Sequence, residues 1–165
     1  MGIPLPIHIS IHVILSLIAG MIVWRIWKKP AAAFLNALIS GVAVDFDHFI
    51  DYFMAFGWSF NFYYFTKGYE FLKTNKMYTL FHGWEYAAIL FLAVFLLKNK
   101  TAKTVLLALA LGLFFHLGTD VVIDKIPVKS YSITNKIRNN FEMQKLVTPE
   151  HWQKHEKKRE RLKFE

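Results

Sequence analysis

Four long apolar stretches constrain the fold of this chain more than any other feature of its sequence. They cover residues 3–27, 31–58, 79–97 and 104–123. A helix needs about 20 apolar residues to cross the hydrocarbon core of a bilayer, because each residue rises about 1.5 Å. Basic residues follow the first and third stretches. The pattern predicts an all-α, polytopic membrane protein with four transmembrane helices and a basic C-terminal helical tail.

Composition supports integral location in a cell or inner membrane. Hydrophobic residues make up 55 % of the 165 residues and charged residues 19 %, whereas soluble domains contain about 25 % charged residues. The first stretch lacks the basic start and the cleavage site of a signal peptide, so we expect it to be retained. The chain has no Cys, so a transition-metal site must use His, Asp and Glu.

Two domains are expected, a transmembrane domain at 1–124 and a basic tail at 125–165. Within the first, residues 58–78 are rich in Phe and Tyr, which is typical of a loop at the membrane–water interface. The tail carries 11 of the 20 Lys and Arg residues of a chain whose net charge is +8. Membrane lipids are its expected partners, and nucleic acid is disfavoured because no base-reading motif is present.

Within the tail, the sequence predicts one well-defined helix. Thr148 is a suitable N-cap, Pro149 fits the first helical position, and Glu150 supplies an acid in the first turn. The helix is expected to run towards Phe164. Its basic face suits an anionic membrane surface.

Ionisable residues lie near one end of every apolar stretch. An Asp at the bilayer centre costs about 2.5–3.5 kcal/mol on insertion scales, so such residues indicate function. Because successive helices alternate in direction, these ends should meet near one membrane face. The residues are His8 and His12 in the first stretch, Asp45, Asp47, His48 and Asp51 in the second, His82 and Glu85 in the third, and His116 and Asp120 in the fourth.

Their spacing favours metal binding on helix faces. Asp47, His48 and Asp51 share an arc of about 100° on a helix, and Asp45 lies about 60° beyond it. The expected pairs on the other helices are His82 with Glu85 at i, i+3, and His116 with Asp120 at i, i+4. Metal sites in helix bundles use similar pairs. Imidazole and carboxylate ligands favour zinc over manganese or iron, with one to three divalent ions.

Some His and Asp residues are not expected to be metal ligands. We expect His8 to be a hydrogen-bonded core or interfacial residue, and Asp124 to be a surface charge next to Lys125. His151 and His155 are expected on the solvated polar face of the tail helix.

Several motifs resemble the bacterial and archaeal membrane-bound metal-dependent hydrolases, the small four-helix family that includes a LexA-regulated inner-membrane member. The similarity covers about residues 8–141. Val44 stands where the family's P-D-x-D-H box has Pro, and Glu85 where many members have a Thr-His pair. The motifs are V-D-F-D-H at 44–48, His12 with Gly20, F-H-G-W-E at 81–85, H-L-G-T-D at 116–120 and P-V-K-S-Y-S-I-T at 127–134.

The resemblance implies a metal-dependent hydrolase with a specific ligand set. The His-x-x-x-Asp step is also similar to that of zinc-dependent phospholipase C, which suggests phosphoester substrates by analogy. The implied metal ligands are His12, Asp45, Asp47, His48, His82, His116 and Asp120.

The expected function is metal-assisted hydrolysis of a phosphoester or ester in a lipid or lipid-linked substrate. The substrate is expected to be amphiphilic and anionic, with Glu85 or Asp51 as general base. One alternative is a non-catalytic transporter or metal sensor. A transporter needs polar groups in both halves of the bundle, and the half next to Arg25 and Lys98 is apolar. A second alternative is a membrane-anchored protein that binds a partner through its tail.

Overall fold

The computed structural model describes residues 4–162, whose regular elements are all helical. Lys76 and Glu142 form an isolated β-bridge. Internal contacts divide the chain into two units. Unit 1 comprises the described residues up to Val44 together with Phe81–Lys125, and unit 2 comprises Asp45–Leu80 together with the described residues from Ile126 onward.

Three helical segments are long and apolar enough to cross a membrane. They are Leu5–Trp27, Pro30–Phe56 and Lys100–Ile123, with mean hydropathies of 2.1, 1.3 and 2.0. The all-helical class is therefore confirmed, and three of the four expected spans have counterparts. Ile3, where we expected the first span to start, lies outside the described residues.

The fourth expected span is shorter than predicted. Helix α6, Trp84–Leu96, has 13 residues, or about 20 Å, against a hydrocarbon core of about 30 Å. The helix does not start at Thr79, because Thr79 has a positive φ of 32° and Gly83 is extended at the N-cap. A count of four spanning helices is therefore not confirmed.

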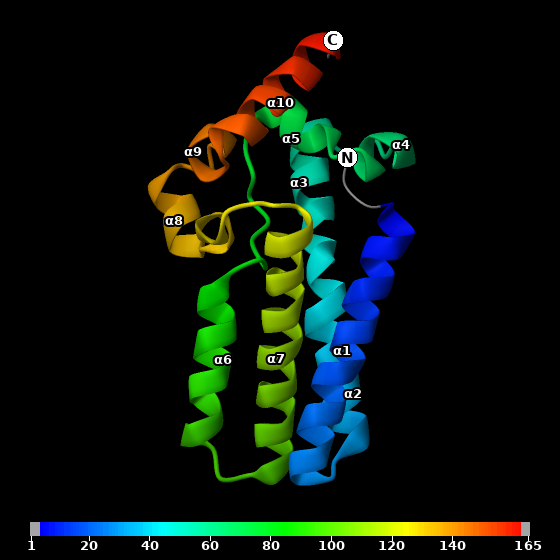
Figure 1. The fold of residues 1–165 in the computed structure, drawn as a ribbon, viewed down its shortest axis with the longest axis vertical. Helices are drawn as coiled ribbons and strands as arrows, with labels where there is room; N and C mark the ends of the chain where they lie inside the picture. The colour runs from blue at the N-terminus through cyan, green and yellow to red at the C-terminus, as the bar shows by residue number, and fades with distance from the viewer. Residues whose placement is uncertain (1–3, 163–165) are drawn as a thin grey trace. The chain divides into compact units, whose positions relative to one another are not determined.

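Unit 1 is built from four helices, with α7 (Lys100–Ile123) packed against α1 (Leu5–Trp27), α2 (Pro30–Val42) and α6. Lys28 ends α1 in the left-handed conformation and donates its N–H to Trp24 O at 2.8 Å. Asn99 caps α7 through its side chain. The α1–α2 and α6–α7 connections lie at the same end of this unit (Figure 1).

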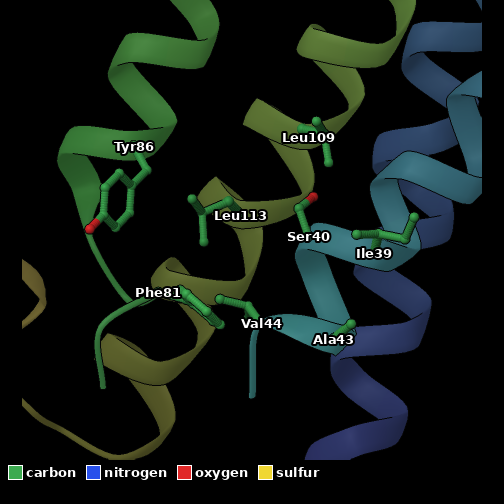
Figure 2. Close-up of a pocket in the computed structure, with 8 residues that line it drawn as sticks. All are labelled: Ile39, Ser40, Ala43, Val44, Phe81, Tyr86, Leu109 and Leu113. Carbon is green, nitrogen blue, oxygen red and sulfur yellow. The ribbon is translucent and has the colours of Figure 1, made fainter. Parts of the chain in front are cut away.

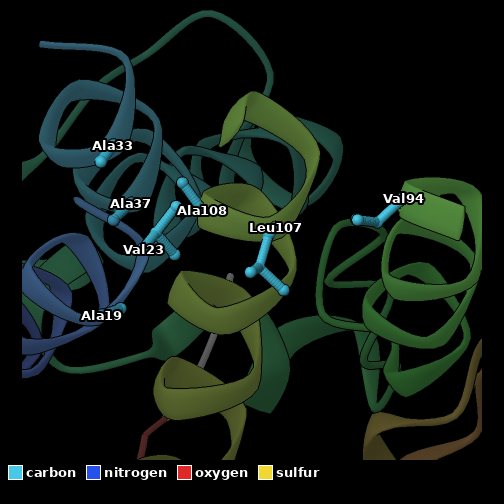
Figure 3. Close-up of a cluster of buried hydrophobic side chains, with 7 residues drawn as sticks. All are labelled: Ala19, Val23, Ala33, Ala37, Val94, Leu107 and Ala108. Carbon is cyan, nitrogen blue, oxygen red and sulfur yellow. The ribbon is translucent and has the colours of Figure 1, made fainter. Parts of the chain in front are cut away.

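Small side chains fill the interior of unit 1, and large apolar ones face outward. Ala19, Ala37 and Ala108 are fully buried where α1, α2 and α7 pack (Figure 3). On α1, by contrast, Ile14 is 56 % exposed and Met21 is 46 % exposed. Small residues at helix contacts with an apolar exterior are typical of helices that face lipid.

The 3₁₀ segment η1 (Ala43–Phe46) spans the boundary between the units. Unit 2 contains short helices from two separate parts of the sequence. They are α3 (Asp47–Phe56), α4 (Phe62–Thr66), α5 (Tyr69–Thr74), η2 (Val128–Tyr131), α8 (Ile133–Arg138), α9 (Met143–Leu146) and α10 (Pro149–Arg161).

The aromatic segment and the tail fold together in this unit. Met77 N–H donates to Phe141 O, and Met143 N–H donates to Asn75 O, each at 2.9 Å. These contacts group the tail with residues 58–78, whereas the sequence suggested a boundary at 124/125.

Helix α10 begins as predicted. Thr148 accepts a hydrogen bond from His151 N–H at 3.3 Å, and Pro149 is the first helical residue. The helix ends at Arg161, and Phe164 lies outside the described residues.

The prediction for His155 is wrong, because its side chain is buried and not on a solvated face. Its Nε2 lies 2.9 Å from Asn75 Oδ1, and its ring stacks on Trp152. Burial, together with the positive charges of Arg159 and Lys158, lowers the pKa of His155 to about 4. The imidazole is therefore neutral at neutral pH.

Candidate metal centre

Four histidines of unit 1 surround one carboxylate. Nε2 atoms of His8 and His12 lie 3.4 and 3.2 Å from Asp120 Oδ1. On the other oxygen, Nε2 atoms of His82 and His116 lie 3.8 and 3.2 Å from Asp120 Oδ2. All except His8 are almost fully buried. Residues from α1, α7 and the segment before α6 thus converge on Asp120.

The nitrogens within each pair face each other at short range. Nε2 of His8 and Nε2 of His12 are 2.7 Å apart, and those of His82 and His116 are 3.0 Å apart. Two imidazole lone pairs at this distance repel each other unless a proton or a cation lies between them. Asp120 Oδ1 is buried and has no hydrogen-bond partner among the described residues. Each of these features suits a bound cation.

A backbone carbonyl orients His116. Its Nδ1 lies 3.1 Å from Gly41 O. A carbonyl only accepts, so Nδ1 carries the proton and Nε2 presents its lone pair towards Asp120. Metal-binding histidines commonly donate their second ring N–H in this way.

Close helix packing brings that carbonyl to His116. A Cβ on Gly41 would lie 2.0 Å from Ser16 Oγ, and one on Gly112 would lie 2.5 Å from Ala37 O. A side chain at Gly112 would require the backbone of α2 to move, and one at Gly41 would require the Ser16 side chain to move. The glycines therefore allow α1, α2 and α7 to approach closely enough for the contact between Gly41 and His116.

The donor set fits a divalent transition metal. His8, His12 and Asp120 form one trio, and His82, His116 and Asp120 form a second, with the donor atoms in each trio within 4.8 Å of one another. Three protein ligands are the number that catalytic zinc sites provide, leaving a position for water or substrate. Imidazole nitrogen and carboxylate oxygen suit zinc and also manganese or iron.

The structure brings together four of the seven implied ligands, His12, His82, His116 and Asp120, and adds His8. His8 was expected as a hydrogen-bonded residue, and its Nε2 lies 2.7 Å from His12 Nε2; the structure also places it in a trio that could hold a metal. Its signal in the sequence was the i, i+4 spacing from His12, which places both on one face of α1.

Two local expectations about the other residues are also corrected. His82 precedes the first residue of α6, so His82 and Glu85 do not share a helix face. Asp45 lies in the 3₁₀ segment η1. It therefore does not continue the α-helical arc of Asp47, His48 and Asp51 on α3.

The remaining candidates belong to unit 2, except Glu85, which lies half-buried in the first turn of α6. His48 Nε2 is 3.8 Å from Asp45 Oδ1. Asp47 and Asp51 are buried, and Asp51 Oδ2 accepts a hydrogen bond from Thr79 N–H at 3.0 Å. The roles of Asp45, Asp47 and His48 as ligands stay predictions.

A second buried charge in unit 2 contacts the same threonine. Lys136 is fully buried, and its Nζ donates to Thr79 O at 2.8 Å and to Thr79 Oγ1 at 2.5 Å.

Glu70 on α5 is also buried, and burial raises its pKa from 4.5 to about 7. The charge of Asp51 adds to this effect.

Comparisons of the chain with family models, with curated proteins and with solved structures find no match.

Proposed function

We propose that this chain is an integral, multi-pass membrane protein and a metal-dependent hydrolase, with its metal centre at Asp120. The observation that carries the proposal is the convergence of four histidine Nε2 atoms on the two oxygens of one carboxylate. The apolar exterior of α1 and the three long apolar helices support membrane insertion. The motif resemblance to membrane-bound metal-dependent hydrolases supports the same reaction class.

His8, His12, His82, His116 and Asp120 would hold the metal, as one or two ions with Asp120 shared. A bound divalent cation would lower the pKa of a coordinated water to about 7. It would also polarise an ester or phosphoryl oxygen. The Nδ1–H of His116 stays on Gly41 O. That hydrogen bond keeps Nε2 directed at the centre throughout turnover.

Glu85 is our first choice for the general base. It lies in unit 1, three residues after His82, and it is half-buried. The second candidate, Asp51, has one oxygen engaged by Thr79 N–H. A base must be able to accept a proton and release it again. Glu85 ranks first because it belongs to the unit that contains the centre and follows the ligand His82 by three residues.

We propose a lipid or lipid-linked phosphoester as substrate, with a carboxylic ester as the second choice. Placing His and Asp on apolar helices costs insertion energy. A water-soluble substrate does not require that placement, whereas a lipid ester has its scissile bond near the membrane interface. Phosphoesters are favoured because an anionic head is attracted to a cationic centre.

The decisive experiment measures metal and turnover on the same preparation. Purified protein should contain at least one equivalent of zinc or another divalent metal by elemental analysis, and should hydrolyse members of a lipid ester panel. Metal-free protein after mild purification in metal-replete buffer would contradict the proposal. Metal-loaded protein that hydrolyses no ester would favour the non-catalytic alternative, a transporter or sensor.

Glu85→Gln separates base from ligand. If Glu85 is the base, the variant keeps its metal and binds lipid but loses turnover. If Glu85 is a ligand, metal content falls with activity. Asp51→Asn in parallel reports on the second candidate, with thermal unfolding as a control for its contact with Thr79.

A further inference from the structure

Unit 1 contains an apolar groove beside the metal centre. Its volume is about 530 Å³, within the roughly 300–1,000 Å³ range of small-molecule sites. Side chains from α2, α6 and α7 surround it (Figure 2). The lining residues are Ile39, Ser40, Ala43, Val44, Phe81, Tyr86, Leu109 and Leu113. Almost all of this surface is hydrocarbon, and Ser40 already donates its hydroxyl to backbone carbonyls of α2.

No residue of the metal centre lines the groove, but residues of both lie on one face of α7. Leu109 and Leu113 line the groove, and His116 and Asp120 belong to the centre. These four positions follow the spacing i, i+4, i+7 and i+11, which forms one stripe on an α-helix. Leu113 and His116 are about 4.5 Å apart along the helix axis. A second connection is Phe81, which precedes the ligand His82.

The surroundings of the groove indicate what fills it. Two of the helices that line it, α2 and α7, belong to segments long and apolar enough to cross a membrane. Ile39 at the groove and Leu35 one turn earlier on α2 are 46 % and 61 % exposed. In a bilayer these surfaces meet acyl chains, so a hydrocarbon chain enters from the side without crossing water.

We propose that this groove binds the acyl chain of the substrate, with the chain along Leu109 and Leu113 and the ester at His116 and Asp120. The inference rests on the proposed hydrolase function and adds to it where the apolar part of the substrate lies. It also predicts selectivity for chain length, because a long chain packs against the groove walls along its length and a short chain does not.

Ile39→Trp tests this assignment, with Ile18→Trp as the matched control. Both isoleucines are similarly exposed, at 46 % and 42 %, but Ile18 does not line the groove. Hydrolysis is measured on hexadecyl and hexyl phosphoesters in phosphatidylcholine nanodiscs, with zinc content on each sample. The lipid that the chain leaves is as apolar as the groove, so the expected effect is steric. The indole occupies the place of the long chain, and the long-to-short ratio should fall towards one. We expect that fall only for Ile39→Trp.

A second readout does not depend on turnover. A hexadecylphosphonate with a terminal diazirine is photolysed with the full chain in the same nanodiscs, and labelled peptides are identified by mass spectrometry. Labels should fall on the groove segments of α2 and α7, and should decrease in Ile39→Trp or after removal of metal by chelation. A hexadecane-chain probe without the phosphonate should label there less.

The outcomes separate the two proposals. Groove labelling that depends on metal and phosphonate, without turnover of any ester, supports the groove and contradicts hydrolysis. Turnover whose chain-length ratio is unchanged in Ile39→Trp overturns the groove assignment and leaves hydrolysis standing. Equal labelling by both probes that is insensitive to chelation would mean that bulk lipid alone fills the groove. That result would also overturn the groove assignment.

Discussion

Buried histidines of unit 1 gather around one carboxylate, whereas Asp51, Lys136 and His155 of unit 2 contact backbone or neutral side-chain groups. Around Asp120, histidine nitrogens lie 2.7 and 3.0 Å apart in pairs. In unit 2, Asp51 and Lys136 both bind Thr79, and His155 contacts Asn75.

This difference separates a site from a structural network. Buried polar groups are normally hydrogen-bonded, although Asp51 Oδ1 and Glu70 Oε2 in unit 2 have no hydrogen-bond partner among the described residues. What distinguishes unit 1 is therefore the gathering of imidazoles around Asp120. Around Asp120, imidazole nitrogens and carboxylate oxygens form two trios whose donor atoms lie within 4.8 Å of one another. A divalent cation satisfies such a cluster and stabilises it by binding only the folded state.

The largest expected effect comes from Asp120→Asn. An amide loses the negative charge that both trios share, so zinc affinity should fall by more than about 100-fold, beyond what outer-shell changes cause. Elemental analysis and competition with a chelator measure it. Asp124→Asn, one turn further along the chain, is the control and should keep its metal. Equal metal content in the two variants would refute the assignment of Asp120.

Lys136→Met should affect stability but not metal. It removes charged hydrogen bonds to Thr79 from a fully buried position, at a cost of about 2–4 kcal/mol in the free energy of unfolding. Thermal unfolding in detergent measures this, with the exposed Lys129→Met as control. Metal loss at unchanged stability would place Lys136 in the centre and remove the contrast between the units.

Glu70 should make unit 2 less stable as pH rises. Its pKa is raised by burial from 4.5 to about 7, so between these values the folded chain binds more protons than the unfolded chain. The free energy of unfolding therefore falls by up to about 3 kcal/mol from pH 5 to pH 8. Glu70→Gln should flatten that slope, and the exposed Glu156→Gln should not. The slope is read from unfolding midpoints across this range.

Gly41→Ala should have the smallest effect on the centre. The new methyl would lie 2.0 Å from Ser16 Oγ and 3.3 Å from Gly112 O. Relief of this crowding should shift Gly41 and weaken the contact between Gly41 O and His116 Nδ1. A loss of about tenfold in zinc affinity is expected, as for other outer-shell partners. Gly118→Ala on α7 is the control, because a Cβ there meets nothing within 4 Å. Unchanged affinity would show that the carbonyl does not hold the imidazole.

The sequence predicted the helical class and most of the cluster. The lengths of the first, second and fourth apolar stretches correctly predicted helices that are long enough to cross a membrane. This length can be read from the run of apolar residues alone. The positions of polar residues along helices of alternating direction predicted that His12, His82, His116 and Asp120 lie close together. Local signals also placed the start of α10, where Thr148 and Pro149 act on the nearest backbone groups.

The tertiary structure decided what depends on rotation and contact. It added His8, whose spacing from His12 could not show that its Nε2 reaches Asp120. His82 precedes helix α6 and does not belong to it, because the backbone at Thr79 and Gly83 is not helical. The tertiary structure also buried His155, which packs on a distant part of the chain at Asn75. Composition and periodicity determine which residues can be helical and how deep they lie, whereas side-chain partners follow from packing between segments far apart in sequence.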